Sequence, residues 1–252
     1  MSSPRASTKN SSLGISVFIP MYNEETNAGI VLPTLQRTLQ SLTEDYEIVV
    51  VDDASRDRTV PLVEDYARRD PRIRLVRHEK NLGYGASLRT GFLSVTKEIV
   101  FYTDADVPID FEILRSVVPL MEENPAIVGY RLDRHDTWRR WLFSQAYNLL
   151  LRLLFGLRVR DVNFSFKLIR KRAVDDFKSR LRSKSVFIDG EILVQLTRLG
   201  YAIREWPVEY RPRKFGLSTL GTWRQAWMTL TEIRDFYFRR GAWSDLIPSP
   251  KQ

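Results

Sequence analysis

Residues 98–108 read EIVFYTDADVP, an apolar run that stops at two carboxylates, Asp104 and Asp106. A continuous rather than alternating apolar run is typical of a strand covered on both faces, as in a parallel sheet. Alternate residues of an extended chain share a face, so both carboxylates can reach one ion. Like charges this close raise one another's pKa, and a divalent cation between them would remove that cost. The stretch predicts a buried strand that ends at a cation site, although an isolated D-x-D triplet also arises by chance in turns and N-caps.

Three further runs of the same kind precede it: ISVFIP (15–20), YEIVVVD (46–52) and RIRLVRH (72–78). Segments of helical length and pattern lie between the runs, at 25–42, 57–69 (with Asp57 as the expected N-cap) and 85–96. Strands alternating with helices indicate right-handed crossovers and an α/β doubly wound, mostly parallel sheet. In that architecture ligands bind outside the carboxyl ends of the strands.

The second half of the chain is less regular. It predicts helices at 138–156 and 189–199 and strands at 163–170 and 201–211. Without an internal repeat or a low-complexity linker, one compound domain is expected. The expected organisation is a disordered lead over 1–13, a single domain over 14–220 and an amphipathic helical tail over 221–252.

The composition is that of a globular protein, with 43% hydrophobic and 28% charged residues among 252. The chain has no cysteine and two histidines, which excludes disulfides and thiolate sites and disfavours zinc and histidine triads, so that any metal would be a hard cation on oxygen ligands. No stretch has the roughly 18 apolar residues of a membrane span. The polar first dozen residues lack the core of a secretory signal, and an organelle-targeting segment is the alternative.

The formal charge of +8 is unevenly spread. Residues 131–182 contain 14 Lys or Arg against 5 Asp or Glu, a local excess of +9. Such a field suits phosphates or an anionic membrane surface. The alternative is a solvated basic surface without a specific partner.

Polar residues follow all four predicted strands of the first half. In chain order they are Pro20, Tyr22, Asn23 and Glu24; Asp52 and Asp53; Asn81 and Gly83; and Asp104 and Asp106. Each group has a local alternative, because prolines and glycines shape turns and aspartates cap helices. NLGYG at 81–85 is not a strand-GxGxxG-helix fingerprint, which disfavours a dinucleotide cofactor. Polar groups at four strand ends on one rim point to a ligand site.

The motifs FIPMYNEE, IVVVDDASRDRT, NLGYGASLRTG and FYTDADV resemble those of the family 2 glycosyltransferases of the GT-A fold. The resemblance is strongest to the polyprenyl-phosphate sugar synthases, such as the dolichol-phosphate mannose synthases, and runs from about residue 15 to 220. GYR at 129–131, DVNFSFK at 161–167 and RKFGLS at 213–218 resemble the acceptor-side motifs of that group.

The resemblance implies a role for each motif. Pro20, Tyr22, Asn23 and Glu24 would cradle the base and ribose of a nucleotide-sugar, with Asp52 near the base, Asp53 near the ribose or the metal, and Asn81 and Gly83 beside the nucleotide. Asp104 and Asp106 would bind Mg²⁺ or Mn²⁺ on the pyrophosphate. Mannose synthases commonly carry Gln or Asn two positions after the second aspartate, where this chain has Pro108. Water or Asp110 would then complete the coordination, and the assignment to a hexose is weakened.

A phosphate acceptor needs cationic groups rather than a base, because its second pKa near 6 leaves it mostly deprotonated. Arg131, after a probable strand, is the first candidate. The other candidates for the acceptor phosphate are Arg211, Arg213, Lys214 and Ser218. Asp161 and Glu191 would orient the acceptor side or act as a base, and structural pairing with an arginine is the alternative for both.

A polyprenyl tail lies in a membrane, so the protein must reach that surface. Residues 138–156 combine Trp138, Trp141 and Phe143 with arginines, which is typical of a helix lying in the headgroup plane. An ordinary core helix with solvated arginines is the alternative. The tail repeats this composition and predicts a second surface helix or an oligomer contact.

The resemblance implies an inverting, metal-dependent transferase, peripheral on the cytoplasmic face of a membrane. It would move a sugar from a nucleotide donor to a polyprenyl phosphate, with GDP-mannose the favoured donor, UDP-glucose the close alternative and another acceptor a further one. A sugar nucleotidyltransferase is disfavoured, because its phosphate loop after the first strand is missing. A basic nucleic-acid-binding protein is the non-enzymatic alternative, and nucleic acid is not the expected partner.

Overall fold

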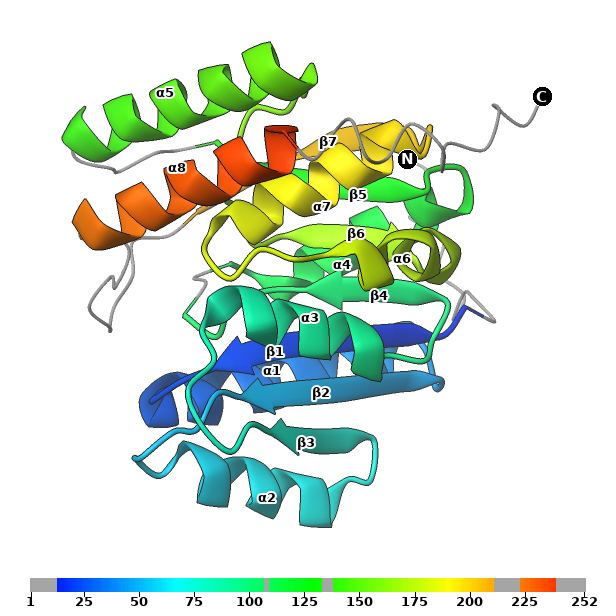
Figure 1. Ribbon diagram of the computed structural model, residues 1–252. Coiled ribbons are helices and arrows are strands. Elements are labelled where there is room, and N and C mark those ends of the chain that lie inside the picture. Colours follow the sequence, from blue (N-terminus) through cyan, green and yellow to red (C-terminus); the bar gives the residue numbers. More distant parts are fainter. Residues whose placement is uncertain (1–12, 107–108, 133–137, 211–222, 239–252) are drawn as a thin grey trace, which may run out of the picture.

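The computed structural model describes residues 13–106, 109–132, 138–210 and 223–238, which form an α/β fold around one sheet (Figure 1). The strands are β1 (Ile15–Met21), β2 (Tyr46–Asp52), β3 (Ile73–Arg77), β4 (Ile99–Tyr102), β5 (Ala126–Arg131), β6 (Lys167–Arg170) and β7 (Ile203–Val208). Their order across the sheet is β3-β2-β1-β4-β6-β5-β7. The predicted fold class is confirmed.

The first four strands are parallel, and the switch of direction comes at β6. β1 pairs in parallel with both β2 and β4, and β2 with β3. β6 runs antiparallel to β4 and to β5, which itself pairs in parallel with β7. Every residue of β2 and β4 is buried, as the unbroken apolar runs predicted for strands covered on both faces.

Helices cover both faces of the sheet. The α-helices are α1 (Glu25–Leu42), α2 (Thr59–Arg69), α3 (Tyr84–Ser94), α4 (Leu114–Val117), α5 (Trp138–Phe155), α6 (Lys171–Phe177), α7 (Phe187–Arg198) and α8 (Trp223–Phe238). Short 3-10 turns are η1 (Phe111–Ile113), η2 (Val118–Glu122) and η3 (Lys178–Arg180). One core lies between the sheet and α1, α2, η1, α4 and η2, and a second lies under α3, α6 and α7.

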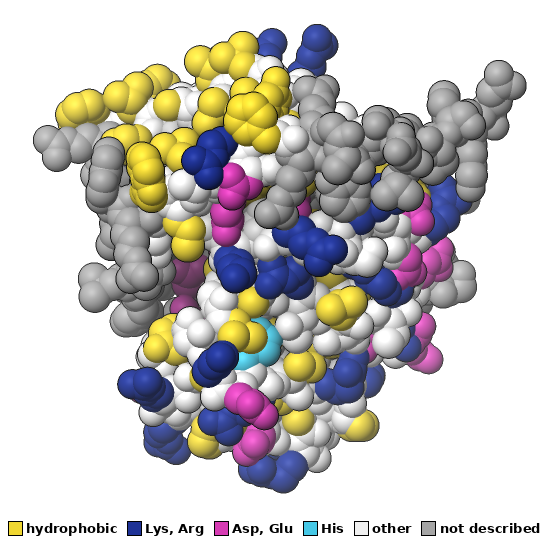
Figure 2. Space-filling view, in the orientation of Figure 1, with side chains coloured by type: hydrophobic (Ala, Val, Ile, Leu, Met, Phe, Trp, Pro, Cys, Tyr) yellow, Lys and Arg dark blue, Asp and Glu magenta, His cyan; other side chains and the backbone are white. Residues whose placement is uncertain are grey.

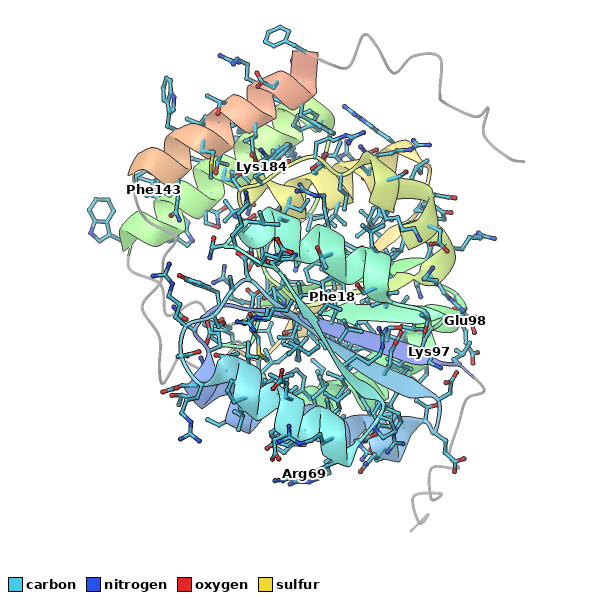
Figure 3. All side chains as sticks on the ribbon, turned by 60° about the horizontal axis from the view of Figure 1, so that its bottom comes forward. Phe18, Arg69, Lys97, Glu98, Phe143 and Lys184 are labelled. Atoms are coloured by element: carbon cyan, nitrogen blue, oxygen red, sulfur yellow. The ribbon has the colours of Figure 1, made fainter. Side chains whose placement is uncertain are left out.

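Alternate residues of β1 serve the two cores. Val17 and Ile19 belong to the first core, and Phe18 to the second, where Figure 3 shows it between the sheet and α3. A Cβ on Gly91 would lie 2.2 Å from the Phe18 ring. Glycine at 91 therefore lets α3 pack closely on the sheet, which places the start of α3 beside the carboxyl ends of the strands.

Helices α5 and α8 lie side by side at one edge of the molecule, beyond α7 (Figure 1). Phe155 of α5 packs against Phe236 and Tyr237 of α8, with ring centroids 5.5 and 6.0 Å apart. Leu151 and Ile233 are buried and tie the two helices to the second core. Among the described residues, no helix is both long and apolar enough to cross a membrane.

Several sequence predictions need correction or lie outside the described residues. The strand predicted over 163–170 begins only at Lys167, and Arg131 is the last residue of β5 rather than a residue after it. Helix α2 starts at Thr59 with Arg58 at the N-cap position, although Asp57 accepts a hydrogen bond from the Thr59 amide. The lead over 1–12, Pro108 and the tail outside 223–238 are not among the described residues.

Candidate functional site

The loops after β1 and β2 are joined by hydrogen bonds at the carboxyl edge of the sheet. The Asn23 amide donates to Ser55 Oγ (2.9 Å), and the Arg56 amide donates to Asn23 Oδ1 (2.8 Å). The Glu24 amide donates to Thr59 Oγ1 (2.8 Å). Asn23 itself adopts a φ of 55°, a left-handed conformation that Asn tolerates better than most residues. These bonds hold the exposed Tyr22 and Asn23 at the rim, next to the half-buried Pro20.

Asp52, the last residue of β2, has a fully buried carboxylate with one oxygen unused. Oδ2 accepts a hydrogen bond from the Ser55 amide (3.1 Å) and lies 3.8 Å from Nε of Arg77. Oδ1 is buried and finds no donor among the described residues. Buried polar atoms are nearly always hydrogen-bonded, so this oxygen can still accept a hydrogen bond from a donor beyond the described residues.

Asp53 is occupied by the protein's own loop. Its Oδ1 lies 2.7 Å from His78 Nδ1 and accepts from the Leu82 amide (2.8 Å), and its Oδ2 accepts from the Gly83 amide (2.8 Å). Gly83 has a φ of 89°, which favours glycine. Asp53 thus shapes the loop that carries the exposed Asn81, and both of its oxygens bind protein groups.

Asp104 and Asp106 lie just beyond β4, as the sequence predicts. Asp104 Oδ1 accepts a hydrogen bond from the Tyr84 hydroxyl (3.1 Å), and this hydroxyl and the nearby Ser165 side chain both lower the pKa of the carboxyl. Burial raises the pKa of Asp104 to about 7, with further contributions from the charges of Asp106 and Asp189. The strand end therefore holds negative charge that the surrounding protein does not fully compensate.

These two carboxylates fit a hard divalent cation such as Mg²⁺ or Mn²⁺. Among the described residues, no group of three or more Asp, Glu, His or Cys could hold a metal. Mg²⁺ commonly takes one or two carboxylates and completes its shell with substrate phosphates and water. Asp104 and Asp106 would therefore hold a cation together with a phosphorylated ligand, and the raised pKa of Asp104 is the electrostatic cost that the cation would offset.

Arg131 and Asp161 form an ion pair on the acceptor side predicted from the sequence. Arg131 Nε and an Nη of the same guanidinium donate to the two Asp161 oxygens at 2.7 and 3.1 Å. The guanidinium carbon lies 5.8 Å from the centroid of the Phe164 ring and 5.4 Å from that of Tyr210. Asp161 is thus paired with an arginine, which is the structural alternative that the sequence left open for it, and this pair fixes the direction of the Arg131 guanidinium. The other acceptor candidates, Arg211, Arg213, Lys214 and Ser218, lie outside the described residues.

Glu191 is fully buried in α7 and holds a loop. Its oxygens accept hydrogen bonds from the Arg182 amide (3.0 and 3.1 Å) and the Ser183 amide (2.8 Å). Burial raises the pKa of this carboxyl. Glu191 therefore has the structural role that the sequence left open as an alternative, but its partners are backbone amides rather than an arginine.

Sequence reasoning missed four residues that surround Asp104. The Tyr84 hydroxyl hydrogen-bonds its carboxylate, the nearby Ser165 side chain lowers its pKa, and Lys167 and Asp189 form a buried ion pair nearby. Tyr84 and Lys167 were in motifs already singled out, NLGYG and DVNFSFK, but no role was read from them. Asp189 lies two residues before Glu191, and neither its burial nor its partner could be read from the local pattern.

Comparisons with known proteins agree with this geometry. The model of the family "Glycosyl transferase family 2" matches residues 16–178. Dolichyl-phosphate beta-glucosyltransferase ALG5A of Trichomonas vaginalis is 32% identical over 246 residues, 92% of this chain and 76% of the relative. Glycosyltransferase AglD of Haloferax volcanii is 29% identical over 211 residues, 79% of this chain but 33% of the relative, so the chain spans about a third of that protein's length.

Solved structures share the fold. Glucosyl-3-phosphoglycerate synthase of Mycobacterium tuberculosis, in complex with phosphoglyceric acid, superposes with a TM-score of 0.67 at 20% identity, covering 91% of this chain and 81% of that one. Its complex with Mn²⁺, UDP and glucosyl-3-phosphoglycerate gives the same TM-score at 19% identity. The sheet with its antiparallel β6 is thus the GT-A fold of glycosyltransferases. With the family model covering most of the sheet and the strand-end motifs in place, the chain belongs to glycosyl transferase family 2.

Proposed function

We propose that this protein is an inverting hexosyltransferase that moves glucose from UDP-glucose to a dolichyl or other polyprenyl phosphate. One observation carries the proposal: the Asp52 oxygen that lacks a donor and the Asp104–Asp106 pair lie on the same edge of one sheet. The sequence favoured GDP-mannose. The relative that covers 92% of the chain is named a dolichyl-phosphate beta-glucosyltransferase, which favours the glucose alternative.

The donor side rests on oxygen ligands. Asp52 Oδ1 would accept an N–H of the base, and Asp104 and Asp106 would hold Mg²⁺ or Mn²⁺ against the diphosphate. The cation supplies charge stabilisation to the departing diphosphate when bound. Gly83, held by Asp53 and lacking a side chain, would let the backbone approach the nucleotide.

The acceptor side needs a cation and no base. Arg131, oriented by Asp161 and flanked by two aromatic rings, would position the lipid phosphate. A deprotonated phosphate oxygen then forms a bond to the anomeric carbon while the bond from that carbon to the diphosphate oxygen breaks. No proton has to be removed, and attack from the side opposite the leaving group inverts the configuration.

Membrane contact is proposed through the apolar face, defined as the exposed apolar residues of α5 and α8. They are Trp138, Trp141, Leu142, Phe143, Leu149, Leu153, Trp227, Met228, Leu230 and Phe238. Figure 2 shows hydrophobic side chains gathered over these helices, with lysines and arginines below them. Phe143 is 75% exposed and projects from the edge of the molecule (Figure 3). An apolar surface bordered by basic groups suits a bilayer with anionic headgroups, and the cytoplasmic face of a membrane is proposed as its location.

The proposal is tested by incubating the protein and Mn²⁺ with UDP-glucose, GDP-mannose and other donors, each with dolichyl or undecaprenyl phosphate. The expected product is a β-glucosyl lipid from UDP-glucose. Asp106→Asn should abolish transfer while the circular dichroism spectrum stays unchanged. If another donor gives the glycolipid, the donor is that nucleotide-sugar and not UDP-glucose. If none of the donors gives a glycolipid, the proposal is refuted.

A further inference from the structure

A lysine and an aspartate form an ion pair in the interior directly behind the candidate cation site. Lys167 is fully buried, and its Nζ donates to Asp189 Oδ1 at 2.7 Å and to the Phe164 carbonyl oxygen at 2.8 Å. Asp189 is 2% exposed and lies in the first turn of α7, where the helix dipole favours a negative charge. Removing two charges from water costs free energy, so a buried ion pair contributes little net stability, and apolar groups of similar volume often replace it without loss of stability.

On the donor side, the pair is connected to the strand that ends at Asp104. Lys167 is the first residue of β6 and lies opposite Tyr102, the last residue of β4, in the antiparallel register. The Tyr102 hydroxyl donates to the same Asp189 oxygen at 2.7 Å, and the Lys167 ammonium lies 5.0 Å from the centroid of the Tyr102 ring. Asp104 follows Tyr102 by two residues, so the position of Tyr102 helps to set that of the carboxylate.

On the other side, the pair holds residues 161–166, here called the acceptor loop. Lys167 Nζ binds the Phe164 carbonyl oxygen within this loop, and the neighbouring Ser165 side chain lies close enough to Asp104 to lower the pKa of that carboxyl. The loop begins at Asp161, which orients Arg131. One ammonium group therefore contacts a backbone oxygen of the loop and the carboxylate that holds Tyr102.

We propose that Lys167 and Asp189 are positioning residues that fix the end of β4 and the acceptor loop in one geometry. Nothing in the pair needs to touch a substrate. The pair would keep Asp104, on the donor side, and Arg131, on the acceptor side, at the separation that sugar transfer between the two substrates requires. The inference rests on the proposed function and deepens it, because it names the residues that hold the two halves of the site together.

The sharpest variant is the double substitution Lys167→Met with Asp189→Asn. Lys167→Met alone would leave a buried carboxylate uncompensated, whereas the double variant removes both charges and keeps an acceptor for the Tyr102 hydroxyl. Lys167→Arg with Asp189 intact is the conservative variant. The matched control is Lys171→Met with Asp175→Asn, an ion pair on the solvent-facing side of α6 near the opposite end of β6.

Two measurements are made on each protein. Kinetics with UDP-glucose and dolichyl phosphate give kcat and the donor KM, and hydrogen exchange is followed in the acceptor loop and, for reference, in α6. For the double variant we expect kcat to fall about 10- to 100-fold with the donor KM within about twofold, because a misplacement of about 1 Å costs rate rather than ground-state binding. Amides of the acceptor loop should exchange faster, α6 should be unchanged, Lys167→Arg should recover part of the rate, and the control should behave as wild type.

The outcomes separate this proposal from the proposed function. A wild-type protein that transfers no sugar refutes the proposed function, and faster exchange confined to the acceptor loop of the double variant would then still support the positioning role. A double variant with wild-type kcat and unchanged loop exchange overturns the positioning role. Loss of the folded circular dichroism signal would also overturn it, because the pair would then be needed for folding.

Discussion

Arg131 Nε lies 2.7 Å from Asp161 Oδ2, and an Nη of the same guanidinium lies 3.1 Å from Oδ1. The Asp161 carboxylate is 3% exposed and the Arg131 side chain 13%, so the pair joins a buried anchor to a side chain with a small accessible surface. A planar guanidinium held at two points keeps a fixed direction, which suits the two-point recognition of a phosphate.

Arg131→Ala is therefore expected to lower lipid transfer about 10²- to 10³-fold while leaving UDP binding within about twofold. Arg131→Lys should recover little, because an ammonium cannot reproduce the two-point geometry. Transfer is measured with radiolabelled UDP-glucose and extraction of the glycolipid. Arg68→Ala, which removes an exposed arginine on α2, is the matched control. If Arg131→Ala transfers sugar to the lipid at the wild-type rate, Arg131 does not position the acceptor phosphate.

Asp52→Asn tests the recognition of the base. An amide in place of the carboxylate alters the acceptor that Oδ1 offers, so UDP affinity should fall about 10- to 100-fold, the range for a lost hydrogen bond to a charged group. Isothermal calorimetry with UDP measures this, and Asp65→Asn, on the surface of α2, serves as the control. If both variants bind UDP like the wild type, Asp52 does not contact the nucleotide.

The raised pKa of Asp104 predicts a pH dependence of stability. Folding raises this pKa from 3.8 to about 7, so between these values the native state keeps a proton that the unfolded chain has released. The free energy of unfolding therefore falls as the pH rises from about 4 to 7 and levels off above it. The Asp104→Asn variant cannot ionise at this position, so its free energy of unfolding does not fall in this way. Without metal, its melting temperature should be about 2–10 °C above that of the wild type at pH 8, and the difference should become smaller toward pH 5.

Calorimetric melting curves at pH 5, 6, 7 and 8 check this prediction. Mn²⁺ with UDP should raise the melting temperature of the wild type at pH 8 and have little effect on Asp104→Asn. Asp65→Asn, on the surface of α2, is the control. Parallel pH curves for wild type and Asp104→Asn would show that Asp104 titrates normally.

The apolar face predicts binding to anionic vesicles. Replacing Phe143, Leu153 and Trp227 by serine removes three side chains that are 62% or more exposed, so folding should be little affected. Partitioning to vesicles containing phosphatidylserine should fall at least about tenfold, since burying each large apolar side chain contributes about 1.5–3 kcal/mol. Leu93→Ser with Ile30→Ser, which removes exposed apolar residues on α3 and α1 (64% and 56% exposed), is the control. Equal sedimentation of all three proteins would locate membrane contact elsewhere.

The sequence was sufficient for the parts of the fold that depend on continuous apolar runs. β2 coincides with the predicted 46–52 and α1 with the predicted 25–42. It did not indicate that β6 would insert antiparallel between β4 and β5, because four residues in the strand are too few for a pattern and direction is set by tertiary packing. The predicted strand over 163–170 was too long for the same reason.

For the site, sequence located the strand-end residues but could not distinguish a carboxylate that keeps an oxygen unengaged by the described residues from one that holds the backbone. Asp52 keeps one oxygen that no described residue donates to, whereas the adjacent Asp53 accepts from two amides and contacts His78. Glu191 is likewise engaged by backbone amides. These differences depend on loops that fold back over long sequence separations, which no local pattern reports.

The central claim is that Asp104 and Asp106 hold a divalent cation that binds the donor diphosphate. Its most direct test is calorimetric titration of UDP into the wild type, with Mn²⁺ and then with EDTA, and into Asp104→Asn/Asp106→Asn. We predict binding that needs Mn²⁺ in the wild type and is weakened at least about 100-fold in the double variant, whose melting curve still shows a cooperative transition. UDP binding of equal strength in EDTA and in Mn²⁺, unaffected by the double substitution, would contradict the claim.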